Sequence, residues 1–167
     1  MSGRVPDMSE PRAIGLGDAA QLNMPSGRFA QPESTGPGRS VPLDLSILPD
    51  ELSVCRLPAR SEMPAWAVPG GLTSMSWTAD ETSVVCASSA VPAGVQVDAG
   101  WRAFVVAGPL ALSLTGVLLS IAQPLADAGI SMFAVSTHDT DYVLVKQTSL
   151  DAAIAALTAF GHRVSGK

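Results

Sequence analysis

Ser136, His138 and Asp141 lie close together in the chain and are the residue types of a hydrolytic triad. In such a triad the histidine takes a proton from the serine hydroxyl while the carboxylate orients the imidazole ring. Here they fall in a polar connection between two expected apolar strands, where their side chains should point in diverging directions. The chain also lacks a G-x-S-x-G elbow, a phosphate-binding glycine loop and a Cys-His arrangement. The sequence therefore predicts no catalytic residues, and we interpret residues 129–145 as a recognition edge for a small molecule.

The cysteines and histidines give no pattern for a metal or a redox group. Cys55 and Cys86 each lie in a strand-like apolar run, without a neighbouring histidine or a C-x-x-C spacing. We interpret both as small buried hydrophobic residues. His138 and His162 are the two histidines, too few to assemble a metal site from imidazole ligands. The sequence accordingly predicts neither a metal site nor a cofactor.

The composition limits the possible partners. Hydrophobic residues make up 47% of the 167 residues, aromatic residues 5% and charged residues 15%, so aliphatic side chains must form the core. The net charge of -5 disfavours nucleic acid, because affinity for phosphate backbones comes from clustered lysine and arginine. Residues 103–126 carry no charge, but Gly108 and Pro109 interrupt them and leave a helical part that is short for a membrane span. With no signal sequence apparent, we expect a cytoplasmic protein without a membrane partner.

The chain divides by composition into three parts. Residues 1–42 are rich in proline, glycine and serine without sustained periodicity, which predicts a disordered tail. Residues 43–98 contain strand-like runs separated by turn residues and little that would form a helix, whereas residues 99–167 are more regular. In the middle part we expect strands near residues 52–56, 72–77 and 83–87.

Residues 99–167 predict the order strand, helix, strand, strand, helix, strand. The first strand is expected at residues 101–106, and the helix after it carries an apolar stripe that ends at Gly129. Pro124 should kink that helix or start a second short one, and the last helix should stop at Gly161. This order is typical of a ferredoxin-like α+β fold, in which an antiparallel sheet carries both helices on one face.

Alternation within the recognition edge assigns its side chains to two faces. Met132, Ala134 and Ser136 should share one face of a strand, and Phe133 and Val135 the other. The neighbouring run at residues 142–145 is almost continuously apolar, which favours a strand covered by helices.

Five segments carry a resemblance to a known family. They are LDLSILPDELSVCRLP, PAWA, SVVCASSAVPAGV, GWRAFVVAGPLALSLTGVLLSIAQPLADAGIS and STHDTDYVLV. Together they resemble bacterial ACT-domain proteins related to the arginine-sensing CASTOR proteins. The resemblance spans residues 43–164 and is most specific in the second half, where LTGVL, AGIS and DTDYVLV occur in order. It implies two ferredoxin-like ACT modules with antiparallel sheets, a degenerate one at residues 43–98 and a second one at residues 99–167.

The resemblance further implies regulation by a small molecule, usually an amino acid, bound at an interface between modules or subunits. In related ACT modules the ligand lies between the loop after the first strand and the strand that follows the first helix. These positions and the nearby polar connection give the expected ligand-binding residues: Ser113, Leu114, Thr115, Gly116, Gly129, Ile130, Ser131, Thr137, Asp139 and Asp141. Backbone amides at a helix start can approach a carboxylate, and Asp139 or Asp141 would receive an ammonium group.

Structural interpretations stay open for some of these residues. Gly129 would end a helix whatever the function, and residues 139–141 have the composition of a plain turn. An alternative function is a ligand-free interaction module that dimerises through strand edges and a helix-free sheet face. We expect a homodimer in either case, and the sequence does not indicate a downstream protein partner.

Overall fold

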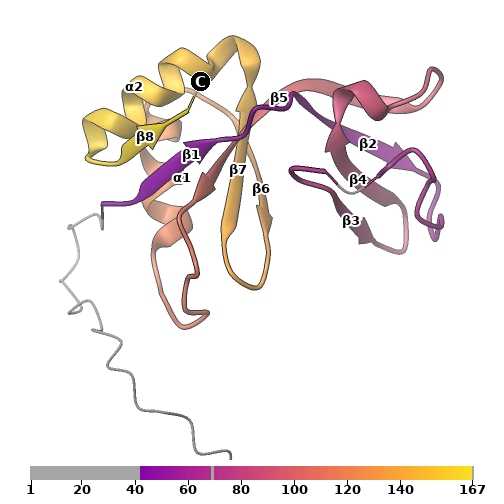
Figure 1. The fold of residues 1–167 in the computed structure, drawn as a ribbon, viewed down its shortest axis with the longest axis horizontal. Helices are drawn as coiled ribbons and strands as arrows, with labels where there is room; N and C mark the ends of the chain where they lie inside the picture. Colours follow the sequence, from indigo (N-terminus) through magenta and orange to yellow (C-terminus); the bar gives the residue numbers. More distant parts are fainter. Residues whose placement is uncertain (1–41, 69, 167) are drawn as a thin grey trace, which may run out of the picture. The chain divides into compact units, whose positions relative to one another are not determined.

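Figure 1 shows the computed structural model, which describes residues 42–68 and 70–166. The predicted tail at residues 1–42 lies, except for Pro42, outside the described residues. The helices are α1 (Val117–Asp127) and α2 (Leu150–Phe160), with short 3₁₀ helices η1 (Ser88–Ala90) and η2 (Gln147–Ser149). The strands are β1 (Asp44–Ile47), β2 (Leu52–Leu57), β3 (Ser74–Trp77), β4 (Thr82–Ala87), β5 (Gln96–Val106), β6 (Met132–Ser136), β7 (Asp141–Lys146) and β8 (Arg163–Ser165).

Strand β5 pairs with strands from the first half (residues 43–98) and from the second half (residues 99–167) of the chain. Its first residues pair antiparallel with β2, and the sheet continues from β2 through β4 to β3. Its last residues pair antiparallel with β1 on one edge and with β7 on the other, and β7 pairs with β6. The predicted module boundary at residue 98 lies inside this strand, which begins at Gln96 rather than at the expected Trp101.

Strand β1 lies between β5 and β8, although it comes from the part of the chain before residue 98. It runs antiparallel to β5 and parallel to β8, with Asp44 opposite Arg163 and Ser46 opposite Ser165. The expectation of a purely antiparallel sheet is wrong at this pair. The reason is geometric, because inserting a strand between two antiparallel neighbours makes it parallel to one of them.

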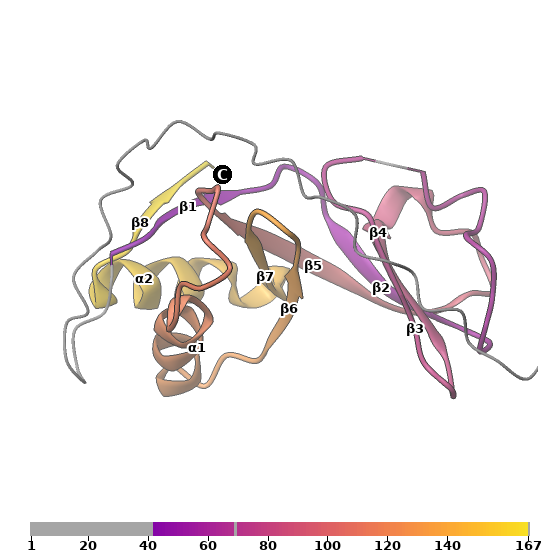
Figure 2. The ribbon, with the colours of Figure 1, turned by 90° about the horizontal axis from the view of Figure 1, so that it is seen from below.

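Helices α1 and α2 lie side by side on one face of β1, β5 and β7 (Figure 2). Strand alternation directs every second side chain of these strands toward the helices. The resulting cluster consists of Leu43, Leu45, Ile47, Phe104, Val106, Ile121, Leu125, Ile130, Val143, Val145, Leu150, Ala153 and Leu157. The ferredoxin-like arrangement predicted for this part of the chain is confirmed. No helix of the described residues is long and apolar enough to cross a membrane.

The opposite face of β5, β6 and β7 packs against residues from the first half of the chain. Trp101, Ala103 and Leu144 form a cluster there with Leu52, Leu72 and Val85, and Phe133 and Val135 pack against it. Met132 packs instead against the cluster under the helices, which confirms the predicted alternation along β6. The helix-free face of the second half is therefore partly covered by the chain itself.

The described residues of the first half form strands and no α-helix between β2 and β4. A third hydrophobic cluster, in this half, contains the buried Cys55, Ala67, Val84 and Cys86, and Trp66 and Met75 pack against it. Both cysteines are free and buried, as predicted.

Helix α1 continues through Pro124, so the predicted second helix start is not observed. Proline has no amide hydrogen and leaves the carbonyl four residues earlier, that of Ser120, without its helical donor. The buried ring of His162 donates from Nε2 to this carbonyl at 2.9 Å. Its Nδ1 accepts the backbone N–H of Leu43 at 3.1 Å. His162 thus completes α1 and joins it to the start of β1.

Candidate functional site

The loop after β5 and the hairpin between β6 and β7 extend from the sheet next to each other (Figure 1). Between them and the start of α1 lies a cavity of about 430 Å³, which we name the loop cavity. This volume is within the range of small-molecule sites. Its lining residues are Leu110, Ala111, Leu112, Leu114, Gly116, Val117, Leu118, Leu119, Ser136, Thr137, His138, Thr140 and Asp141.

The loop and the hairpin are joined by backbone and side-chain contacts. Leu110 donates its backbone N–H to the carbonyl of Asp139 at 2.8 Å, and the Thr140 hydroxyl donates to the carbonyl of Val106 at 2.5 Å. Gly108 permits this close approach, because a Cβ at its position would lie 2.7 Å from the Asp139 carbonyl oxygen. The two segments that line the loop cavity are therefore fixed relative to each other.

The hairpin closes on itself through Thr137 and Thr140. The backbone N–H of Thr137 and its hydroxyl both donate to the Thr140 carbonyl, at 2.8 and 3.0 Å. This closure presents Ser136 and Asp141, which are cross-strand partners, side by side at the cavity.

The start of α1 forms the other side of the cavity. Gly116 precedes the helix with φ of 84°, a left-handed conformation that favours glycine. Leu114 donates its N–H to the carbonyl of Ala111 at 2.8 Å, which closes a turn just before the helix. This turn brings leucine side chains from the loop next to those of the first helical turn.

The polar side chains of the hairpin form two separate pairs. The Ser136 hydroxyl donates to Asp141 Oδ1 at 2.5 Å, and His138 Nδ1 lies 2.8 Å from Asp139 Oδ1. Our expectation that Ser136 and Asp141 would diverge is therefore wrong, because they face each other across the β6–β7 pair. His138 contacts Asp139 rather than Ser136, so the three residues do not have the order of contacts of a triad.

The structure brings part of the predicted ligand-binding set together. Leu114, Gly116, Thr137 and Asp141 line the loop cavity. The other predicted residues of these two segments are exposed neighbours in the chain that do not line it: Ser113, Thr115 and Asp139.

The remaining predicted residues, Gly129, Ile130 and Ser131, lie at the opposite end of α1. A helix of 11 residues spans roughly 16 Å at about 1.5 Å per residue, so these residues do not reach the loop cavity of their own chain. Gly129 adopts φ of 70° just after the helix, and Ile130 is buried in the cluster under the helices. Both positions have structural roles, as the helix-stop interpretation predicts for Gly129.

Several cavity residues were not predicted from the sequence, above all the exposed leucines. Leu112 is 77% exposed and Leu119 is 66% exposed, although both belong to a strongly apolar run. Leu119 falls outside the apolar stripe expected for this helix, and that position was the signal in the sequence for its exposure. Thr140 was missed as well, and no sequence pattern points to its bond with Val106.

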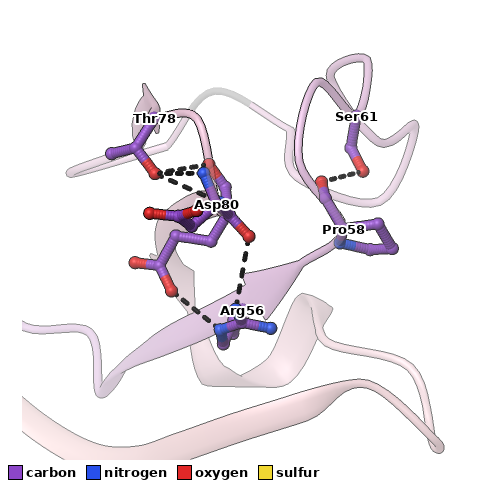
Figure 3. Close-up of polar contacts among 6 residues, drawn as sticks. Arg56, Pro58, Ser61, Thr78 and Asp80 are labelled. Carbon is purple, nitrogen blue, oxygen red and sulfur yellow. Dashed lines mark hydrogen bonds and ion pairs between the residues drawn. The ribbon is translucent and has the colours of Figure 1, made fainter.

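A second group of polar side chains lies in the first half of the chain (Figure 3). Arg56 Nε donates to Glu81 Oε2 at 2.7 Å, and the Arg56 guanidinium also donates to the carbonyl of Asp80. The Thr78 hydroxyl accepts the backbone N–H groups of Asp80 and Glu81. These contacts close the β3–β4 turn onto β2, so we assign them a structural role. The described residues contain no group of three or more metal-ligating side chains.

Two family models match the sequence. The ACT domain matches residues 96–159, and a second family, described as an N-terminal domain, matches residues 50–94. The predicted resemblance to ACT domains is thereby confirmed, whereas the relation to the CASTOR proteins stays a prediction. A search of curated proteins found no match.

Solved structures give the same fold. Protein Atu0741 from Agrobacterium tumefaciens is 39% identical, with a TM-score of 0.72, and the match covers 75% of this chain and 94% of that one. The chain belongs to the same family as Atu0741, and residues 96–159 of this chain match the ACT domain.

Two more distant structures share the fold alone. Protein VC0802 from Vibrio cholerae, described as a possible transport protein, is 16% identical with a TM-score of 0.58, over 71% of this chain and 90% of that one. The aspartate kinase of Clostridium acetobutylicum is 10% identical with a TM-score of 0.53, over 70% of this chain and 34% of that one.

Proposed function

We propose that this protein is a non-catalytic regulator that binds an amino acid in the loop cavity. The observation that carries the proposal is the position of this cavity, at the start of α1 in the part of the chain that matches the ACT family. The Clostridium acetobutylicum aspartate kinase, which shares the fold, is described as an allosteric enzyme, and this supports a regulatory role. The effect of a bound amino acid would be transmitted through contacts between ACT modules, in a cytoplasmic protein.

In this proposal Asp141 receives the ligand ammonium group, with Asp139 and Thr137 beside it on the hairpin. The segment at residues 113–116 provides backbone groups on the opposite side of the cavity. An ammonium–carboxylate contact is charge-assisted, and its strength increases as water is excluded.

Two further elements of the proposal concern assembly. Residues 43–98 act as a degenerate ACT-like module, and a homodimer forms through module contacts. Because Gly129, Ile130 and Ser131 are a helix length away from the cavity of their own chain, they would contact a ligand only from a second copy.

A thermal-shift screen of the purified full chain against the twenty amino acids tests the proposal. Binding to the native state raises the free energy of unfolding by RT ln(1 + [L]/Kd), and the unfolding temperature rises with it. We expect a saturable shift with an amino acid, and we expect Asp141→Asn to remove it while leaving the circular dichroism spectrum unchanged. Asparagine keeps an acceptor for Ser136 and removes only the charge. A panel without any shift would contradict ligand binding.

The exposed leucines favour a second candidate, a ligand-free dimerisation module. Leu112 and Leu119 are large apolar side chains in water, and such patches often mark contacts with another protein. Light scattering separates the two candidates. A stable dimer that is unaffected by amino acids, and that dissociates in the Leu119→Ser variant, would support the ligand-free dimerisation module.

A further inference from the structure

The two sides of the loop cavity differ in their chemistry. The side formed by residues 110–119 is aliphatic, and two of its leucines, Leu112 and Leu119, are exposed to solvent by 77% and 66%. Covering such side chains is favourable in proportion to the apolar area removed from water. A ligand that covers them therefore gains affinity only if part of it is apolar.

The hairpin side is polar and acidic. Asp141 lines the cavity, Asp139 lies beside it, and His138 is paired with Asp139. None of the described residues that line the cavity is a lysine or an arginine. A ligand with excess negative charge, such as a phosphate or a dicarboxylate, finds no opposite charge on these side chains.

We infer that the loop cavity is selective for an aliphatic α-amino acid of the leucine and isoleucine type. Its ammonium group contacts Asp141 and its side chain covers Leu112 and Leu119. This inference rests on the proposed function, because it names the ligand class of the same site. In this inference the cavity recognises the ammonium group and the aliphatic group of the ligand, because it has complementary side chains for both.

Calorimetric titration of the full chain with leucine and two analogues tests this assignment. Leucinamide retains the ammonium group and the side chain, whereas isocaproate retains the side chain and the carboxylate. We expect leucinamide to bind about as tightly as leucine, and isocaproate to bind at least about tenfold more weakly. Affinity should also rise from alanine through valine to leucine, by up to about fourfold for each added methylene.

The outcomes separate this inference from the proposed function. If serine, lysine or aspartate binds saturably and leucine does not, the inferred selectivity for aliphatic amino acids is wrong, whereas the proposed binding of an amino acid is retained. Isocaproate binding as tightly as leucine would also overturn the assignment of Asp141. If no amino acid binds, both the proposed function and the selectivity are wrong.

Substitutions at the aliphatic side locate the ligand. We expect Leu119→Ser to weaken leucine binding by about tenfold. Val68→Ser is a matched control, because Val68 is 62% exposed and does not line the loop cavity; this variant should bind leucine normally. Unchanged leucine affinity in Leu119→Ser, together with a changed oligomeric state, would assign the leucines to a subunit contact and contradict the inference.

Discussion

His162 donates a hydrogen bond from Nε2 to the carbonyl oxygen of Ser120, the carbonyl that Pro124 deprives of its helical donor. A side chain from the end of the chain thus replaces a missing backbone donor inside α1. A carbonyl only accepts and a backbone N–H only donates, so these partners require the proton on Nε2 and a free lone pair on Nδ1.

We expect His162→Phe to lower the free energy of unfolding by about 2 to 4 kcal/mol, because it leaves two buried backbone groups without partners. Pro124→Ala restores an amide donor for Ser120, so in that background the same substitution should cost about 1 kcal/mol less. Urea unfolding of the four proteins in this double-mutant cycle measures the difference. Strict additivity would show that the two residues are not coupled.

Gly108→Ala should destabilise the protein by about 1 to 3 kcal/mol, because the added Cβ meets the carbonyl oxygen of Asp139 at 2.7 Å. The hairpin must move away from the loop, which should also weaken any ligand bound in the loop cavity. Gly70→Ala is the matched control, since nothing lies within 4 Å of its added Cβ. Equal unfolding temperatures of the two variants would contradict the close approach.

Burial raises the pKa of the Cys55 thiol to about 11, and it also raises that of Cys86. A thiol whose pKa is higher in the folded than in the unfolded chain contributes stability below the unfolded value, and this contribution disappears as pH rises through the folded value. We expect the free energy of unfolding to fall between about pH 9 and pH 11, and to fall less in Cys55→Ala.

Val84→Ala provides the control for this measurement. Val84 is the buried cross-strand partner of Cys55 and carries no titratable group. Its substitution should lower stability equally at each pH. A pH dependence in Cys55→Ala as steep as in the wild type would contradict the role of the thiol.

A hydrogen bond from Arg163 lowers the pKa of Asp44 below its usual value of 3.8. The lowered pKa contributes stability above about pH 4, and this contribution disappears as pH falls through the folded value. Asp44→Asn should therefore make acid unfolding less steep below pH 4, and Arg163→Gln should have the same effect. The change should be small because both side chains are more than half exposed. Acid titration followed by circular dichroism measures it.

Local patterns in the sequence predicted the second half of the fold well. Gly129 and Gly161 end the two helices with positive φ angles, as their positions after apolar stripes indicated. The alternation of Met132 with Phe133 and Val135 was also correct, because a strand between two apolar layers must divide its side chains in this way.

The pairing of β1 with β8 could not be predicted from local patterns. Periodicity reports which face of a strand is buried, not which strand lies beside it. The continuation of α1 through Pro124 was missed for a similar reason, since the compensating donor, His162, comes from a distant part of the chain.

The candidate site was predicted only in part, because its aliphatic side depends on exposure rather than on composition. Leu112 and Leu119 belong to an apolar run that includes the buried Ile121 and Leu125. Neither leucine belongs to the apolar stripe expected for the helix, but only tertiary packing determines that both stay in solvent beside the polar hairpin.

The place of β1 in the sheet also determines the order in which the chain can fold. Ser46 in β1 and Ser165 in β8 are 119 residues apart in sequence, yet their hydroxyl groups lie 3.3 Å from each other. During synthesis β1 leaves the ribosome before its two partner strands, and its edges stay unpaired until β5, and then β8, have been made. Contacts this distant in sequence slow folding and prolong the exposure of strand edges. The sheet of the second half is therefore completed by β1, which precedes β2, β3 and β4 in the chain, so the two halves cannot finish folding one after the other.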